Sequence, residues 1–86
     1  MAERTITVLN PTGIHARPAT MVVDFAKKYP GTVSVIKGDK TGDLKSILKV
    51  LTMGLKKGTE ITLQVSGENE EEFLESLCDF IANLEG

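Results

Sequence analysis

The chain has 86 residues, the size of one small domain, so we expect residues 1–86 to form a single domain. Hydrophobic residues make up 41% and charged residues 26%, which is typical of a folded globular domain and excludes a disordered chain. The net charge is −2 without a long basic stripe, and no apolar run approaches the ~20 residues that cross a bilayer, so neither nucleic-acid binding nor membrane insertion is expected.

The first part of the chain predicts a strand, a turn and a helix. Residues 3–9 alternate in polarity and are rich in β-branched side chains, which favours a strand. The sequence Asn10-Pro11-Thr12-Gly13 is typical of a turn. From Ala16 to about Lys28 the apolar residues recur at helical spacing, with Pro18 suited to the first turn, and Pro30-Gly31 ends this helix.

The middle of the chain predicts two strands around a hairpin, followed by a short helix. Residues 32–37 form the second strand, and residues 38–42 form a tight turn that a short third strand could follow. Ser46 to Met53 is predicted as a short helix, with Ser46 as its N-cap and Gly54 just past its end.

The last part predicts a strand and a longer helix. Residues 60–66 alternate as a strand after a turn at Gly58. A final helix begins near Asn69, with Glu72 as the capping-box partner of Asn69. Its buried stripe is expected to contain Phe73, Leu74, Leu77, Ile81 and Leu84.

The order β-α-β-β-α-β-α indicates an α+β sandwich, a mostly antiparallel sheet with helices on one face. Because aromatic residues are few, the core should be built mainly from Val, Ile, Leu and the three Phe. The only cysteine, Cys78, has helical spacing to Leu74 and Ile81 and is predicted to lie in that core. With one histidine and one cysteine we expect no metal site, and with a lone cysteine and no signal-peptide pattern we expect the cytoplasm.

The run Gly13-Ile14-His15-Ala16-Arg17-Pro18-Ala19 holds the only histidine. Its spacing places an imidazole at a helix start, where unpaired backbone N–H groups of Ala16 and Arg17 and the helix dipole favour an anion. Arg17 adds a planar donor fork that matches phosphate oxygens. This pattern predicts reversible phosphorylation of His15, although a lone histidine is more often a surface or capping residue.

This run resembles the active-site signature of the HPr family, the histidine-containing phosphocarriers of the bacterial phosphoenolpyruvate:sugar phosphotransferase system. A second stretch, Leu44-Lys45-Ser46-Ile47-Leu48, resembles the serine-phosphorylation region of that family, and the similarity spans the whole chain. The resemblance implies an open-faced sandwich with a four-stranded antiparallel sheet and three helices on one face. It also implies a carrier that needs no cofactor and is not itself an enzyme.

The resemblance further implies roles for individual residues. His15 would accept a phosphoryl group on Nδ1 from phosphorylated enzyme I and pass it to enzyme IIA domains of sugar permeases, while Arg17 steadies the phosphate. Ser46 would be a regulatory phosphosite for a dedicated serine kinase/phosphorylase, which also implies regulatory protein partners. A cap alone explains Ser46 equally well, and the two roles are compatible.

A docking surface is expected beside the histidine. Some apolar residues of the short helix at 46–53 should form an exposed patch, although packing under the sheet is an equal alternative for each. Asp24 departs from the neutral or basic residue that family members often carry there. The candidate docking residues are Thr20, Met21, Asp24, Lys27, Ile47, Leu48, Lys49 and Leu51.

Three functions stay open at this point. The first is a sugar-system phosphocarrier, which we expect to be a monomer because it must present one face to successive partners. The second is a regulatory paralogue, for example of a nitrogen-related branch, whose phosphorylated state is a signal. The third is a binding module with an incidental histidine, against which Arg17 and Pro18 argue. The match around Ser46 favours the sugar branch.

Overall fold

The alternating and helical patterns of the sequence form four strands and three helices in the predicted order. The structure is a computed structural model that describes residues 1–11 and 13–84, so Thr12 of the predicted turn and residues 85–86 lie outside the described residues. The elements are β1 (Ala2–Thr7), α1 (Ala16–Lys27), β2 (Thr32–Lys37), β3 (Lys40–Asp43), α2 (Ile47–Thr52), β4 (Glu60–Ser66) and α3 (Glu70–Ala82).

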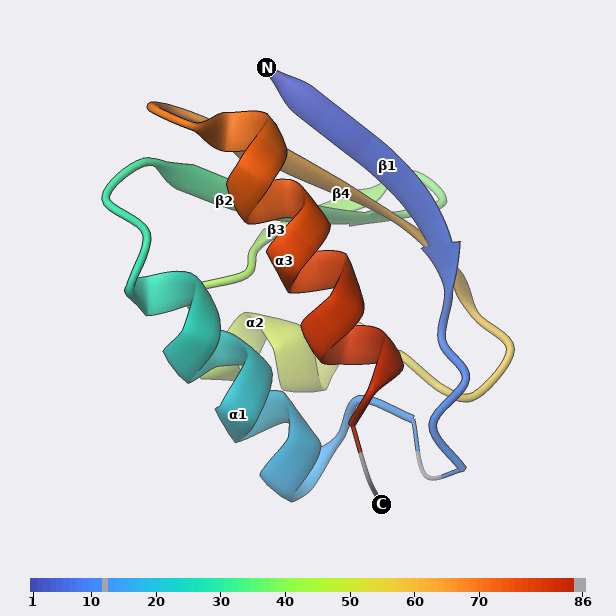
Figure 1. The fold of residues 1–86 in the computed structure, drawn as a ribbon. Helices are drawn as coiled ribbons and strands as arrows, with labels where there is room; N and C mark the ends of the chain where they lie inside the picture. The colour runs from blue at the N-terminus through green and yellow to red at the C-terminus, as the bar shows by residue number, and fades with distance from the viewer. Residues whose placement is uncertain (12, 85–86) are drawn as a thin grey trace.

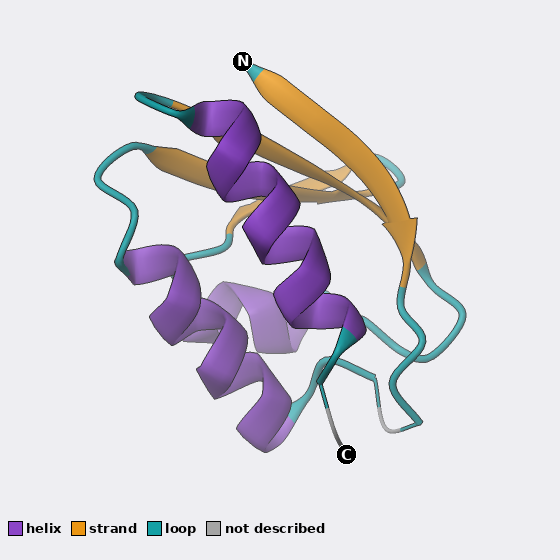
Figure 2. Cartoon of the chain, viewed as in Figure 1, coloured by secondary structure: helices purple, strands orange, loops and turns teal. Residues whose placement is uncertain are grey.

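The strands form one antiparallel sheet in the order β1-β4-β2-β3. Figure 1 shows all three helices on the same side of this sheet, and Figure 2 separates the helical layer from the strand layer by colour. In β4 the side chains of Ile61, Leu63 and Val65 are buried under the helices, whereas Thr62 and Gln64 alternate onto the open face. The predicted α+β open-faced sandwich is confirmed.

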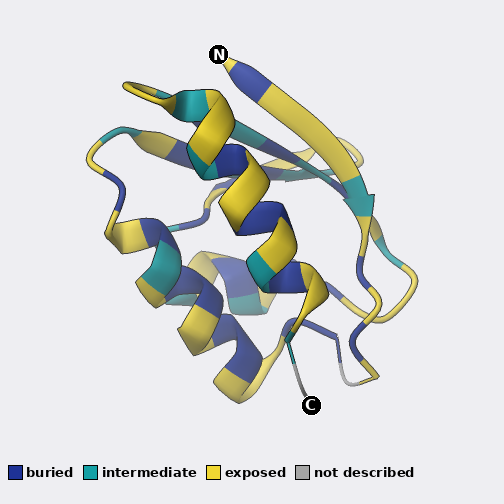
Figure 3. Cartoon of the chain, in the orientation of Figure 1, coloured by how far each residue is buried: buried dark blue, intermediate teal, exposed yellow. Residues whose placement is uncertain are grey.

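The core lies between the two layers and is almost entirely aliphatic (Figure 3). The prediction that the three Phe belong to it is wrong, because Phe25, Phe73 and Phe80 are only half-buried. Their rings stack between α1 and α3, with centroids 4.5 Å apart for Phe25–Phe80 and 4.3 Å apart for Tyr29–Phe73. Valine, isoleucine and leucine side chains make up most of the core between the sheet and the helices, and the phenylalanine rings pack at its margin, between α1 and α3. Cys78 is buried, as predicted.

Two element boundaries differ from the predictions. The first strand ends at Thr7 rather than at residue 9, although Val8 still donates to the carbonyl of Thr59, and Leu9 is 66% exposed. The hairpin turn is confined to Gly38 and Asp39, so β3 begins at Lys40, inside the predicted turn. Gly38 has φ = 60°, which permits this tight reversal. The first helix agrees with its prediction, since it runs from Ala16 to Lys27 with Lys28 as its C-cap.

One predicted helix cap is confirmed and one is wrong. The Ser46 hydroxyl accepts a hydrogen bond from the backbone N–H of Lys49 at the start of α2. Asn69 instead adopts a left-handed conformation with φ = 55° and makes no side-chain cap, so the capping box with Glu72 does not form. An N-cap side chain normally needs an extended backbone to reach the first N–H groups, which explains the difference.

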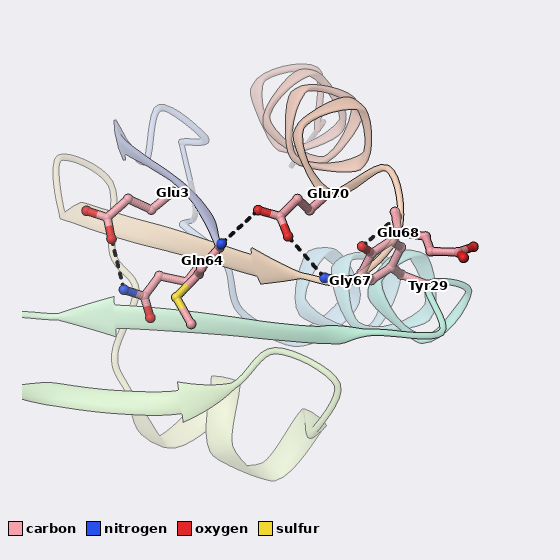
Figure 4. Close-up of polar contacts among 7 residues, drawn as sticks. Glu3, Tyr29, Gln64, Gly67, Glu68 and Glu70 are labelled. Atoms are coloured by element: carbon pink, nitrogen blue, oxygen red, sulfur yellow. Dashed lines mark hydrogen bonds and ion pairs between the residues drawn. The ribbon is translucent and has the colours of Figure 1, made fainter.

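Glu70 replaces the predicted capping box at this end of the molecule (Figure 4). One of its carboxylate oxygens accepts a hydrogen bond from the N–H of Gly67 at 3.3 Å, and the other lies 2.9 Å from the amino group of Met1. The Tyr29 hydroxyl donates to the neighbouring carbonyl of Glu68 at 2.7 Å. These contacts join β1, α1 and the β4–α3 turn. None of the described helices has the length and apolarity needed to span a membrane.

The Glu70 contacts predict a pH-dependent contribution to stability. The hydrogen bond from the amino group of Met1, followed by that from Gly67, lowers the pKa of Glu70 below its usual 4.5. A carboxyl whose pKa is lower in the folded state stabilises the fold above its unfolded pKa, and this contribution is lost as the pH falls through the folded pKa. We expect Glu70→Gln to lower the free energy of unfolding near neutral pH and to have no effect in acid.

Urea unfolding as a function of pH measures this difference. The matched control is Glu71→Gln, which changes an exposed carboxyl in the same helical turn. A Glu70→Gln effect that is equal at neutral and acid pH would contradict the assignment, because it would then not depend on the ionised carboxyl.

Candidate functional site

The segment that carries His15 packs against the turn between α2 and β4. The N–H of Ile14 donates to the carbonyl of Leu55 at 2.7 Å, and both side chains are buried. The N–H of Gly58 donates to the carbonyl of Val8 at 2.7 Å, which fixes the other end of the segment. Two segments about forty residues apart in sequence are therefore joined directly behind the histidine.

Gly13 makes this close approach of the two segments possible. It has φ = 73°, in the left-handed region that glycine enters at little cost. A Cβ at this position would lie 2.5 Å from the carbonyl oxygen of Leu55 and 2.9 Å from the Cα of Lys56. The predicted tight turn at Gly13 is confirmed, and the structure adds its reason, which is contact with another backbone.

His15 lies exposed at the N-terminus of α1. Its backbone is extended, with φ = −144° and ψ = 154°, and its side chain does not cap the helix. The first turn of α1 carries no acidic side chain. The backbone N–H groups at this end therefore keep their partial positive charge beside an accessible imidazole. The predicted position of His15 at a helix start is confirmed.

The backbone of Ala16, which has φ = 51°, sets the geometry of the step from His15 into α1. Left-handed geometry costs a residue with a Cβ roughly 1–2 kcal/mol, so the step from His15 into the helix is strained. The carbonyl of Ala16 accepts a hydrogen bond from the Thr20 hydroxyl at 3.3 Å. Sequence reasoning missed this feature because alanine is the strongest helix former.

Arg17 is exposed and faces the groove between α1 and α3. This groove has a volume of about 880 Å³, and its lining includes Arg17, Met21, Phe25, Asp79, Phe80 and Asn83. Within the part of the chain that the structure describes, no ion pair or hydrogen bond joins Arg17 to another side chain. Among residues 1–11 and 13–84, no hydrogen bond joins this guanidinium to the His15 imidazole either.

The predicted docking residues lie on two neighbouring helices, and their exposure differs. On α1, the side chains of Thr20, Met21, Asp24 and Lys27 are all exposed. On α2, Leu48 is 73% exposed and Lys49 is also exposed.

Ile47 and Leu51 are half-buried and pack against the core instead. Of the apolar residues on α2 that were expected to form an exposed patch, only Leu48 is exposed. Met21 on α1 is the second exposed apolar side chain among the candidate docking residues. Ser46 is half-buried at the start of α2.

Cys78 offers no second nucleophile in this protein. Burial raises the pKa of its thiol, against the opposing effect of the nearby Arg4 guanidinium. A protonated, buried thiol is a poor nucleophile. Among the described residues there is also no group of three or more His, Cys, Asp or Glu side chains arranged to hold a metal ion.

Comparisons with known proteins agree with the fold. The sequence profile of the family described as "PTS HPr component phosphorylation site" matches residues 2–83. The chain is 38% identical to the phosphocarrier protein HPr of Lysinibacillus sphaericus over 98% of this chain and 96% of that protein.

Solved structures show the same similarity. The crystal structure of an HPr from Thermoanaerobacter tengcongensis superposes with a TM-score of 0.91 at 38% identity, covering 95% of this chain and 92% of that one. A second structure from that organism, described as an HPr dimer, has a TM-score of 0.74 at 38% identity, covering 95% of this chain and 94% of that one.

The fold and these comparisons define a phosphocarrier, a protein that is a substrate for phosphoryl transfer rather than a catalyst. The chain belongs to the HPr family, and its role is that of a carrier in the phosphotransferase system.

The backbone contact behind His15 predicts the cost of adding a side chain at Gly13. We expect Gly13→Ala to lower the free energy of unfolding by at least about 2 kcal/mol, since left-handed geometry and overlap with a backbone carbonyl act together. The matched control is Gly38→Ala, because Gly38 has φ = 60° but no atom within 4 Å of its added Cβ. Urea unfolding compares the two variants, and equal losses would show that the contact with Leu55 does not matter.

Proposed function

We propose that the Nδ1 atom of His15 accepts a phosphoryl group from phosphorylated enzyme I and passes it to enzyme IIA domains of sugar permeases. The proposal includes a cytoplasmic location and a monomeric state. The observation that carries it is the exposed imidazole at the uncapped N-terminus of α1. An acceptor that must meet a donor and then a recipient needs such exposure on both occasions.

The transfer needs little from this protein beyond position and charge. In the neutral imidazole with its proton on Nε2, the lone pair of Nδ1 attacks phosphorus while the bond from phosphorus to enzyme I breaks. The negative charge of the transferred group then lies at the N-terminus of α1, where the N–H groups of Ala16 and Arg17 and the helix dipole favour it. The Arg17 side chain supplies further donors.

The face formed by α1 and α2 is the proposed docking surface for both partners. Leu48 is its exposed apolar residue on α2, with Ile47 and Leu51 packed beneath. On α1, the exposed Met21 lies at its border, since Met21 also lines the groove toward α3. Arg17, Lys27 and Lys49 provide positive charge that attracts acidic partners, and Thr20 lies beside them on α1. Asp24 places a negative charge on this face, so we propose that it weakens docking to strongly acidic partners.

Phosphorylation of this protein by enzyme I is the first test. We expect incubation with phosphoenolpyruvate, magnesium and a bacterial enzyme I to add one acid-labile phosphate, detected by intact mass, and His15→Ala to abolish it. A His15→Ala variant that still gains the phosphate would contradict the assignment. Arg17→Ala should slow phosphate acceptance roughly 10- to 100-fold, the effect of losing a charged hydrogen bond in the transition state. No label on the wild type with several active enzyme I preparations would favour a paralogue with another donor, or a binding module.

Ser46 is proposed as a regulatory phosphosite for a serine kinase/phosphorylase. Its hydroxyl already lies at the start of α2, where the dipole tolerates negative charge, so phosphorylation would act on docking more than on folding. The added charge would lie on the α1–α2 face and repel acidic partners.

The charge at position 46 therefore predicts slower transfer without unfolding. We expect Ser46→Asp to reduce the rate of phosphoryl transfer from enzyme I and to leave thermal unfolding cooperative. Ser46→Ala is the control, because it removes the cap, worth about 1 kcal/mol, without adding charge. Stopped-flow transfer assays compare the three proteins, and equal rates for the wild type and Ser46→Asp would rule out this form of regulation.

A further inference from the structure

Lys37 is a half-buried lysine whose ammonium group binds two backbone carbonyls. It is the last residue of β2, and its Nζ donates to the carbonyls of Met53 at 2.9 Å and Gly54 at 3.0 Å. Met53 is the C-cap of α2, so its carbonyl is one of those that a helix end leaves without an intrahelical partner, and Gly54 follows just past that end. A lysine at this place satisfies them and complements the negative end of the helix dipole.

The carbonyls bound by Lys37 lie directly before the residue that holds the histidine segment. Leu55 follows Gly54, and its carbonyl accepts the hydrogen bond from the N–H of Ile14. The N–H of Lys56 also donates to the carbonyl of Gly54 at 2.9 Å, which closes the turn. Through the covalent link from Gly54 to Leu55, these hydrogen bonds connect the end of β2 to Ile14, the residue before His15.

The same lysine also fixes the end of α2, which carries the proposed docking residues. Met53 is buried, and its N–H donates to the carbonyl of Lys49. Gly42 of β3 allows α2 to lie close to the sheet, since an added Cβ there would meet Met53 at 2.9 Å and Lys49 at 2.6 Å. Lys37 thus connects the rigid sheet to both parts of the site.

We propose that Lys37 is a positioning residue for phosphoryl transfer, which acts by holding the turn that supports Ile14 and His15. This inference rests on the proposed function. It does not place Lys37 in contact with phosphate, since its ammonium group is bonded to the carbonyls of Met53 and Gly54.

Lys45 offers a matched comparison within the chain. Its Nζ donates to the carbonyls of Tyr29 and Gly31, each at 2.6 Å, after the C-terminus of α1. Lys37 and Lys45 are both half-buried and both bind two carbonyls, but only Lys37 is linked to the turn behind His15. Substituting either residue removes the same chemistry from a different place.

The experiment compares Lys37→Met, Lys37→Arg and Lys45→Met with the wild type. Methionine keeps an unbranched stem without the ammonium, whereas arginine keeps a cationic donor. The first measurement is hydrogen exchange of the Ile14 amide by NMR, corrected for the global stability of each variant. The second is kcat and KM for each protein as a substrate of enzyme I and phosphoenolpyruvate.

We expect Lys37→Met to accelerate exchange of the Ile14 amide at least about tenfold relative to Lys45→Met. We also expect it to lower kcat/KM for phosphorylation at least about threefold, with substantial recovery in Lys37→Arg. Equal Ile14 exchange and equal transfer in Lys37→Met and Lys45→Met would overturn the role of Lys37 while leaving the carrier function intact. A wild-type protein that accepts no phosphate would instead overturn the proposed function, and the role of Lys37 in transfer with it.

Discussion

The hydrogen bond from Ile14 to Leu55 is the contact on which the rest of the site depends. It joins the loop after β1 to the turn after α2, and it forms only because Gly13 lets the two backbones approach. Once that contact is made, the chain must turn sharply to start α1. The extended backbone of His15 and the left-handed backbone of Ala16 are the result. The exposed side chain of His15 thus follows directly on the buried residue Ile14, which is bonded to Leu55.

That arrangement suits a carrier better than a catalyst. An enzyme usually encloses its reactive group to exclude water, whereas His15 lies at the surface with the uncapped end of a helix beside it. The helix end and Arg17 can stabilise charge on a transferred group without enclosing it. Exposure of the imidazole lets partner proteins supply whatever else the transfer needs.

Much of the fold could be predicted because the local patterns agree with it. The period-two alternation of residues 60–66 and the apolar stripe of the last helix each follow from one buried face, and Ser46 and Gly54 mark the ends of α2 by ordinary capping chemistry. The candidate histidine could also be identified, since Gly13, Arg17 and Pro18 surround it within one short run.

The features that were missed depend on contacts between distant segments. The capping box at Asn69 failed because that residue takes a left-handed turn and Glu70 binds the amino group of Met1 and the N–H of Gly67. The phenylalanines lie at the margin of the core because aliphatic side chains fill its interior, and their rings stack on one another between α1 and α3. No local sequence pattern predicts the hydrogen bonds from Lys37 to the carbonyls of Met53 and Gly54, because they form only once the sheet and α2 are packed together.

The central claim is that the N-terminus of α1 holds a phosphoryl group on Nδ1 of His15. Phosphorus–nitrogen NMR of the ¹⁵N-labelled, phosphorylated protein tests it most directly, together with the amide shifts of the residues that begin α1. The account predicts coupling of phosphorus to Nδ1 and large changes in the amide proton shifts of Ala16 and Arg17. Coupling to Nε2, or amide shifts at Ala16 and Arg17 that do not change on phosphorylation, would contradict it.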